Sequence, residues 1–209
     1  MSPRPYRMGK RQAARRETRS RILEAARQLL ATESNTDLSM EAIARKADVS
    51  RLTIYYQFSS RAGLLEALYD HLAQRGHMHQ MADVFQTADI SSAIEKMVRT
   101  FVGFWATDPQ AMRRLRGMAA LDPEIAQGIH GRDARRPRIA LEILKRPPSR
   151  THTKLGPGQQ RMAADVLSML TSFESYDALA RAGQTEAQIL RTLTQLARCV
   201  INNIGDEHE

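Results

Sequence analysis

The sequence predicts an all-α protein, with a small N-terminal three-helix domain that contains a helix-turn-helix and a larger helical domain after it, about nine helices in total. Apolar residues recur at spacings of three and four along most of the chain, which is the period of amphipathic helices. Little of the sequence alternates as a strand would, and Pro and Gly separate the periodic segments at short intervals. We expect the domains to be a basic flexible arm over residues 1–15, the helix-turn-helix domain over 16–62 and the larger domain over 63–209.

The first third contains the helix-turn-helix. A helix is expected over residues 16–33 and a loop over 34–37. Four apolar residues at helical spacing then give a short helix its inner face: Met40, Ile43, Ala44 and Ala47. Ser39 is placed to cap that helix, and Asp48 lies where the chain must turn. Ser50 is placed to cap a second helix over 51–57, whose Ile54 and Phe58 can pack inward.

The rest of the chain divides at its Pro and Gly residues. Helices are expected over 61–74, 90–106, 109–121, 124–144 and 159–182, and loops over 83–89 and 146–158. Pro137 should kink or divide the helix in which it lies. Thr185 and Gln188 have the spacing of a capping box and should start the last helix.

The positive charge is concentrated at the N-terminus. The net charge is +8, and residues 1–21 hold eight basic side chains against Glu17 alone, which accounts for seven of those charges. Residues 22–62 hold five basic and five acidic groups. Blocks of like charge at a terminus often act as interaction arms. Salt-sensitive affinity for a polyanion is therefore expected to come largely from the arm.

Composition argues against several classes of protein. No apolar run approaches the roughly 20 residues of a membrane span, and the basic N-terminus lacks the apolar stretch of a secretory signal. The single cysteine, Cys199, excludes an internal disulfide and fits a reducing cytoplasm. His71, His77 and His79 lack the acidic or cysteine neighbours typical of a metal site. No catalytic arrangement is found, so neither an enzyme nor a cofactor is expected.

Residues 38–61 resemble the DNA-binding region of the TetR family of bacterial regulators. The residues that carry the resemblance are ILEAARQLL over 22–30, MEAIARKADVS over 40–50 and TIYYQFSSRAGLLEAL over 53–68. It covers about the first third of the chain; the rest matches only in architecture. Asp48 replaces the usual Gly, and Gln57 stands where His or Tyr is common.

The resemblance implies DNA contacts. Thr53, Tyr55, Tyr56 and Arg61 would mainly touch phosphates, whereas Arg51, Leu52 and Gln57 would face base edges from a helix that Ser50 starts. The basic arm would add backbone or minor-groove contacts through Arg4, Arg7, Lys10 and Arg11. The alternative for the arm is a tail that only aids solubility.

The larger domain should provide a ligand pocket and a dimer interface. Aromatic and methionine side chains suit an apolar or planar effector, although they also suit a plain core. The candidates are Phe101, Phe104, Trp105, Met118, Met169, Phe173 and Tyr176. The last two long helices are expected to form a four-helix interface with a second copy. The candidates there are Met162, Val166, Leu193, Leu196, Val200 and Ile201.

These expectations describe a cytoplasmic, nucleoid-associated homodimer that binds a pseudopalindromic operator in double-stranded DNA and is released by a small-molecule effector. Two alternatives stay open. The chain could be a helical ligand-binding or scaffold protein whose helix-turn-helix no longer reads DNA. It could also be an activator, since activators and repressors use the same DNA-binding surface.

Overall fold

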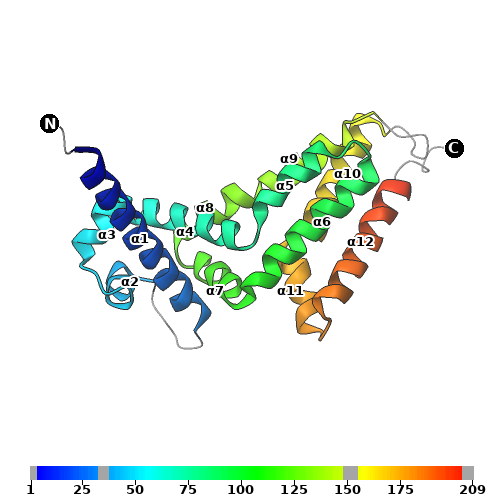
Figure 1. Ribbon diagram of the computed structural model, residues 1–209. Coiled ribbons are helices and arrows are strands. Elements are labelled where there is room, and N and C mark those ends of the chain that lie inside the picture. Colours follow the sequence, from blue (N-terminus) through cyan, green and yellow to red (C-terminus); the bar gives the residue numbers. More distant parts are fainter. Residues whose placement is uncertain (1–3, 33–37, 148–154, 204–209) are drawn as a thin grey trace. The chain divides into compact units, whose positions relative to one another are not determined.

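The computed structural model describes residues 4–32, 38–147 and 155–203. Within these ranges the chain forms twelve α-helices and one short 3-10 helix, without strands (Figure 1). The all-α class is therefore confirmed, with more helices than the nine expected. The additional helices arise because several predicted long helices are broken.

The chain divides into two compact units. The first comprises Met1–Leu72 with Gln110–Gly128, and the second comprises Ala73–Pro109 with Ile129–Glu209. This division differs from the boundary expected after residue 62. Helix α4 (Arg61–Arg75) buries Leu64, Leu65 and Leu68, and it stays with the first unit as far as Leu72.

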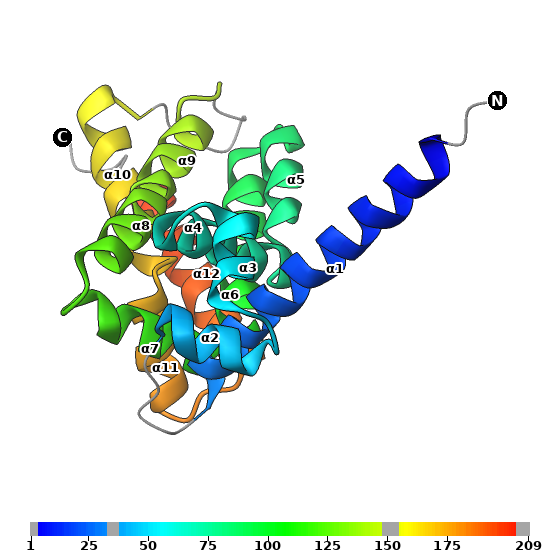
Figure 2. The same ribbon diagram turned by 90° about the vertical axis from the view of Figure 1, so that its left-hand side faces the viewer.

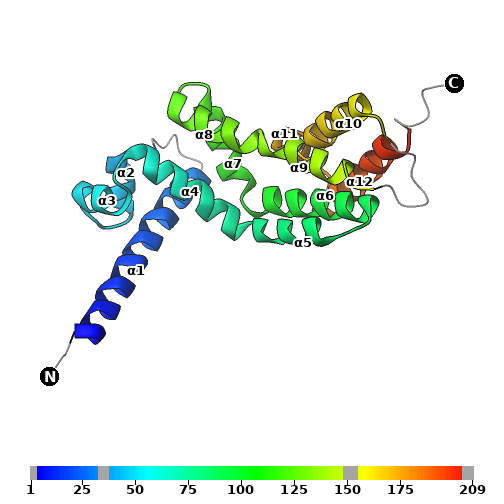
Figure 3. The same cartoon turned by 90° about the horizontal axis from the view of Figure 1, so that it is seen from above.

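The first unit is built on α1 (Arg4–Ala31), which packs against α2 (Met40–Lys46) and α3 (Arg51–Phe58). It also contains α7 (Pro109–Ala119) from Gln110 onward and the first half of α8 (Pro123–Asp133). The prediction of an arm without regular structure over 1–15 differs from the structure, in which α1 begins at Arg4. Pro5 lies in the first helical turn, where its missing N–H breaks no helical hydrogen bond. The N-terminal turns of α1 extend past α2 and α3 (Figures 2 and 3).

The turns of the helix-turn-helix have the predicted caps. The Ser39 and Ser50 hydroxyls accept hydrogen bonds from the backbone N–H groups of Ala42 and Thr53. Asp48 adopts the left-handed conformation at φ 50°, which Asp tolerates better than most residues. After α3, the Ser60 hydroxyl accepts a hydrogen bond from the N–H of Gly63 and caps α4. A Cβ atom at Gly63 would lie 2.2 Å from the Phe58 carbonyl oxygen, so the α3–α4 corner requires glycine there.

The second unit contains the end of α4, a 3-10 helix (Met78–Gln80), and then α5 (Met81–Gln86) and α6 (Ile90–Thr107). It continues with the end of α8 and with α9 (Arg135–Leu144), α10 (Pro157–Leu170), α11 (Phe173–Arg181) and α12 (Glu186–Asn203). Helix α6 lies against α12, and α9 lies against α10.

Three predicted segments of this unit differ in detail. The loop expected over 83–89 is partly helical, because α5 extends to Gln86. The helix expected over 159–182 is broken after Leu170, where Ser172 accepts a hydrogen bond from Ser175 N–H and starts α11. The helix around Pro137 is divided as expected, at Ala134, since proline has no N–H to donate to the Asp133 carbonyl. Of the predicted loop over 146–158, residues 148–154 lie outside the described part of the chain.

The predicted capping box of the last helix is confirmed. The backbone N–H of Thr185 donates to Gln188 Oε1 at 2.8 Å, and Gln188 N–H donates to Thr185 Oγ1 at 3.4 Å. These two reciprocal bonds satisfy donors that a helix start leaves unpaired, and they fix the first turn of α12.

Candidate nucleic-acid interface

Helix α3 has one buried face and one face open to solvent. Ile54 is fully buried and Phe58 is 5% exposed, so these two side chains anchor the helix in the first unit. On the opposite side Leu52 and Tyr56 are 59% and 73% exposed. Large apolar and aromatic side chains rarely stand this far into water on so short a helix without a partner. This outer face, which Arg51 and Tyr55 extend, suits contact with the edges and backbone of a DNA groove.

The N-terminal part of α1 holds the C-terminal end of α3. The Arg19 guanidinium donates to the Gln57 carbonyl oxygen at 2.7 Å and lies 4.2 Å from the centre of the Phe58 ring. The Gln57 side-chain amide in turn donates to the Arg15 carbonyl at 3.3 Å. One arginine therefore combines a charged hydrogen bond with a cation–π contact. These contacts fix the direction of the recognition helix within the first unit.

An open, basic groove lies beside these contacts. Its volume is about 440 Å³, and its lining residues are Gln12, Arg15, Arg16, Arg19 and Gln57. Three guanidinium groups in one groove favour a phosphate backbone as ligand. The sequence reasoning missed Arg15, Arg16 and Arg19 as site residues. The spacing of Arg11, Arg15 and Arg19 at four residues was the available signal, because helical spacing aligns them on one face.

Some predicted DNA contacts fall on residues whose side chains are described and others do not. Arg11 is exposed, whereas the side chains of Arg4, Arg7 and Lys10 lie outside the described part of the structure. Thr53 is half-buried, and its hydroxyl lies 2.9 Å from the Ser50 hydroxyl. Gln57 was expected at base edges, but its amide is turned toward the backbone of α1.

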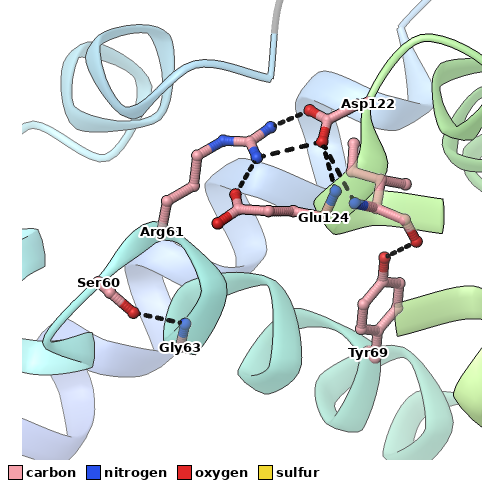
Figure 4. A network of polar contacts seen from close by, with 7 residues as sticks. Ser60, Arg61, Gly63, Tyr69, Asp122 and Glu124 are labelled. Atoms are coloured by element: carbon pink, nitrogen blue, oxygen red, sulfur yellow. Dashed lines mark hydrogen bonds and ion pairs between the residues drawn. The ribbon is translucent and has the colours of Figure 1, made fainter. Parts of the chain in front are cut away.

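Arg61 differs most from its expected role. It was predicted to touch phosphate, but its guanidinium forms ion pairs with Asp122 and Glu124 at the start of α8 (Figure 4). Asp122 accepts through both carboxylate oxygens, and its Oδ1 also accepts from the N–H groups of Glu124 and Ile125 at 3.1 and 3.3 Å. The hydrogen bond with Arg61 holds the pKa of Asp122 below its usual range, and the bond with Asp122 raises the pKa of Arg61. All of these residues belong to the first unit.

The predicted ligand-pocket residues of the second unit form a packed aromatic cluster. Ring centres lie 4.4 Å apart for Phe104 and Trp105, 5.5 Å for Trp105 and Phe173, and 6.3 Å for Phe173 and Tyr176. Phe101 stacks on Trp105, and the indole N–H donates to the Thr171 carbonyl at 3.0 Å.

The two methionines of the predicted pocket lie apart from this cluster. Met169 is 59% exposed, which differs from a place among pocket-lining side chains. Met118 belongs to the first unit. The cluster itself has the packing of a core.

Apolar side chains are exposed on two helices of the second unit that pack against each other. On α10, Met162 and Met169 are 48% and 59% exposed, and on α12 Leu196 is 46% exposed. Val166 and Val200 are half-buried. Leu193 and Ile201, which were also predicted at the interface, are instead buried within the unit at 2% and 6% exposure. They lie on the inner face of α12, four residues from Ala197 on either side.

In the described residues, no helix has both the length and the apolarity to span a membrane. The same part of the chain has no group of three His, Cys, Asp or Glu side chains arranged to bind a metal ion.

Comparison with known proteins identifies relatives of the same kind. The family model for bacterial regulatory proteins of the tetR family matches residues 22–68. The HTH-type transcriptional regulator AlkX of Mycobacterium tuberculosis is 32% identical over 112 residues, which is 51% of this chain and 51% of AlkX. EthR of Mycolicibacterium smegmatis, also an HTH-type transcriptional regulator, is 30% identical over 44% of this chain and 43% of its own length. The matched region thus spans about half the length of these curated relatives.

Solved structures share the fold over most of the chain. NalD, the secondary repressor of the MexAB-OprM multidrug efflux pump in Pseudomonas aeruginosa, superposes with a TM-score of 0.66 at 20% identity. That superposition covers 93% of this chain and all of NalD. A transcriptional regulator from Saccharomonospora viridis in complex with choline gives a TM-score of 0.65 at 19% identity, over 87% of this chain and 96% of that one.

Proposed function

Because the chain belongs to the TetR family of bacterial regulatory proteins, we propose that it is a homodimeric transcriptional repressor that leaves a pseudopalindromic operator when a small ligand binds. The exposed face of α3 carries the proposal, since Leu52 and Tyr56 stand in water on a helix that is firmly anchored behind. Such a regulator acts at the nucleoid in the cytoplasm.

In this proposal, α3 and α1 have different tasks. Arg51 and Leu52 read base edges, because a guanidinium can pair with guanine and an apolar side chain can contact a thymine methyl group. The groove lined by Arg15 and Arg16 binds phosphates, so the salt dependence of affinity arises there and in the basic residues before it. Gln57 supports the contact between α1 and α3.

Two copies are needed for a two-fold symmetric operator. The exposed side chains of Met162, Met169 and Leu196 support an interface formed by α10 and α12. Burial of such side chains contributes about 25 cal/mol per Å² of apolar surface, which is the main driving force for association. The ligand is expected in the second unit, and the choline complex of the S. viridis regulator shows that a protein of this fold can hold a small molecule.

Selection of duplexes from random-sequence DNA tests this function. The proposal predicts recovery of a sequence with two inverted half-sites, which the protein binds at least about 1,000-fold more tightly than a shuffled duplex. Sedimentation of the complex should give two protein chains per duplex. Binding without sequence preference would favour the alternative of a scaffold protein whose helix-turn-helix no longer reads DNA.

A further inference from the structure

Two carboxylates contact the Arg61 guanidinium, and they differ in how firmly they are held. Asp122 caps α8 through its bonds from two backbone N–H groups, and its side chain is 25% exposed. Glu124 projects from the first turn of α8, and its side chain is 48% exposed. Asp122 is thus fixed by the backbone, whereas Glu124 is the more easily displaced of the two.

A second contact keeps α4 and α8 together independently of Arg61. Two turns further along α4, the Tyr69 hydroxyl donates to the Ile125 carbonyl at 3.0 Å, and Tyr69 is only 5% exposed (Figure 4). A Cβ atom at Gly128 would lie 2.3 Å from the Tyr69 ring, so the ring lies directly on the backbone of α8. The beginning of α8 therefore stays beside α4 when the partners of Arg61 change.

Arg61 is also at the position where a phosphate would bind. It is the first residue of α4, only two residues after α3. The positive end of the helix dipole favours an anion there, and the two carboxylates now supply it. A guanidinium has five N–H donors, so it can keep a bidentate bond to one carboxylate and donate to a phosphate at the same time.

On the basis of the proposed function, we propose that Asp122 is a positioning residue that aims Arg61 at a DNA phosphate, and that Glu124 occupies the place which the phosphate takes in the complex. Glu124 then competes with DNA, whereas Asp122 assists DNA binding. This assignment makes an unusual prediction, because removing either negative charge should strengthen DNA binding if the charges act only through long-range repulsion.

The experiment measures affinity as a function of salt for a selected duplex of about 30 base pairs, long enough for two half-sites. Glu124→Gln should raise the affinity about two- to fivefold, the range expected for breaking a partly exposed ion pair. Asp122→Asn should lower the affinity and reduce the slope of log affinity against log salt by about 0.9, because one phosphate contact per chain is lost. Asn is itself a good N-cap, so α8 keeps its start.

Two further variants separate the proposed route from other effects. Adding Glu124→Gln to Arg61→Gln should change nothing beyond Arg61→Gln, because Glu124 acts through Arg61. Glu41→Gln removes an exposed carboxylate from the first turn of α2 and serves as the matched charge control. If Asp122→Asn does not fold, Glu124→Gln with and without Arg61 still decides.

The outcomes distinguish this inference from the proposed function. Equal gains in affinity for Asp122→Asn, Glu124→Gln and Glu41→Gln would overturn the inference and leave the proposed function intact. A gain from Glu124→Gln that persists without Arg61 would do the same. Absence of any sequence-preferring DNA binding by the unmodified protein would overturn both.

Discussion

Replacing Arg19 by Ala should destabilise the first unit and weaken DNA binding, because this side chain joins α1 to the end of α3. The hydrogen bond from its guanidinium to the Gln57 carbonyl contributes about 1.5 kcal/mol, the value for a charged donor at a partly buried site. The contact with the Phe58 ring adds about 0.5 kcal/mol. The expected loss in the free energy of unfolding is therefore about 2 kcal/mol, or about 4–8 °C in Tm for a chain of this length.

Urea unfolding and DNA titration of three variants measure this effect. Arg16→Ala removes the same charge from an exposed position next to the same groove, and it should leave the free energy of unfolding nearly unchanged. Arg19→Lys keeps the charge but lacks the planar fork, and it should fall between the other two. If Arg19→Ala were as stable as Arg16→Ala, the proposed anchoring of the recognition helix by α1 would be refuted.

Three further predictions concern charge, assembly and pH. Replacing Arg15 and Arg16 together by Ala should reduce the slope of log affinity against log salt by about two per chain, measured by fluorescence anisotropy; an unchanged slope would place the groove away from phosphate. Leu196→Glu should produce monomers in sedimentation experiments without unfolding the chain, and a persistent dimer would contradict an interface at α12. The hydrogen bond from Arg27 lowers the pKa of Glu24 to about 2 from an ordinary 4.5. A depressed carboxyl pKa stabilises the fold above about pH 4.5 and loses this effect toward pH 2. Glu24→Gln should therefore cost about 1 kcal/mol near pH 7, since screening reduces the effect at a side chain one-third exposed. A difference from the unmodified protein that did not shrink in acid would contradict this.

The local parts of the fold could be predicted from sequence because their causes are local. Ser39, Ser50 and Thr185 each cap a helix three residues or fewer away, and Pro137 divides its helix through its own missing N–H. The break before α11 was missed because apolar residues at helical spacing continue across it. Its available signal was Ser172, whose hydroxyl caps the second helix.

The candidate site was predictable in part for the same reason. The outer face of α3 follows from the inward positions of Ile54 and Phe58 four residues apart. The partners of Arg61 could not be found in this way, because Asp122 and Glu124 lie 61 and 63 residues further along the chain. Likewise, Gln57 appears free in a helix considered alone, and only the packing of α1 turns its amide inward.

The central claim is that α3 reads sequence while α1 supplies backbone affinity. The most direct test compares Arg51→Ala with Arg16→Ala, using the ratio of affinities for the selected and the shuffled duplex. Arg51→Ala should reduce this ratio about 5- to 150-fold, as expected for one lost base contact, with little change on shuffled DNA. Arg16→Ala should weaken both duplexes alike and leave the ratio unchanged. If both variants altered the two affinities equally, the assignment of base reading to α3 would be contradicted.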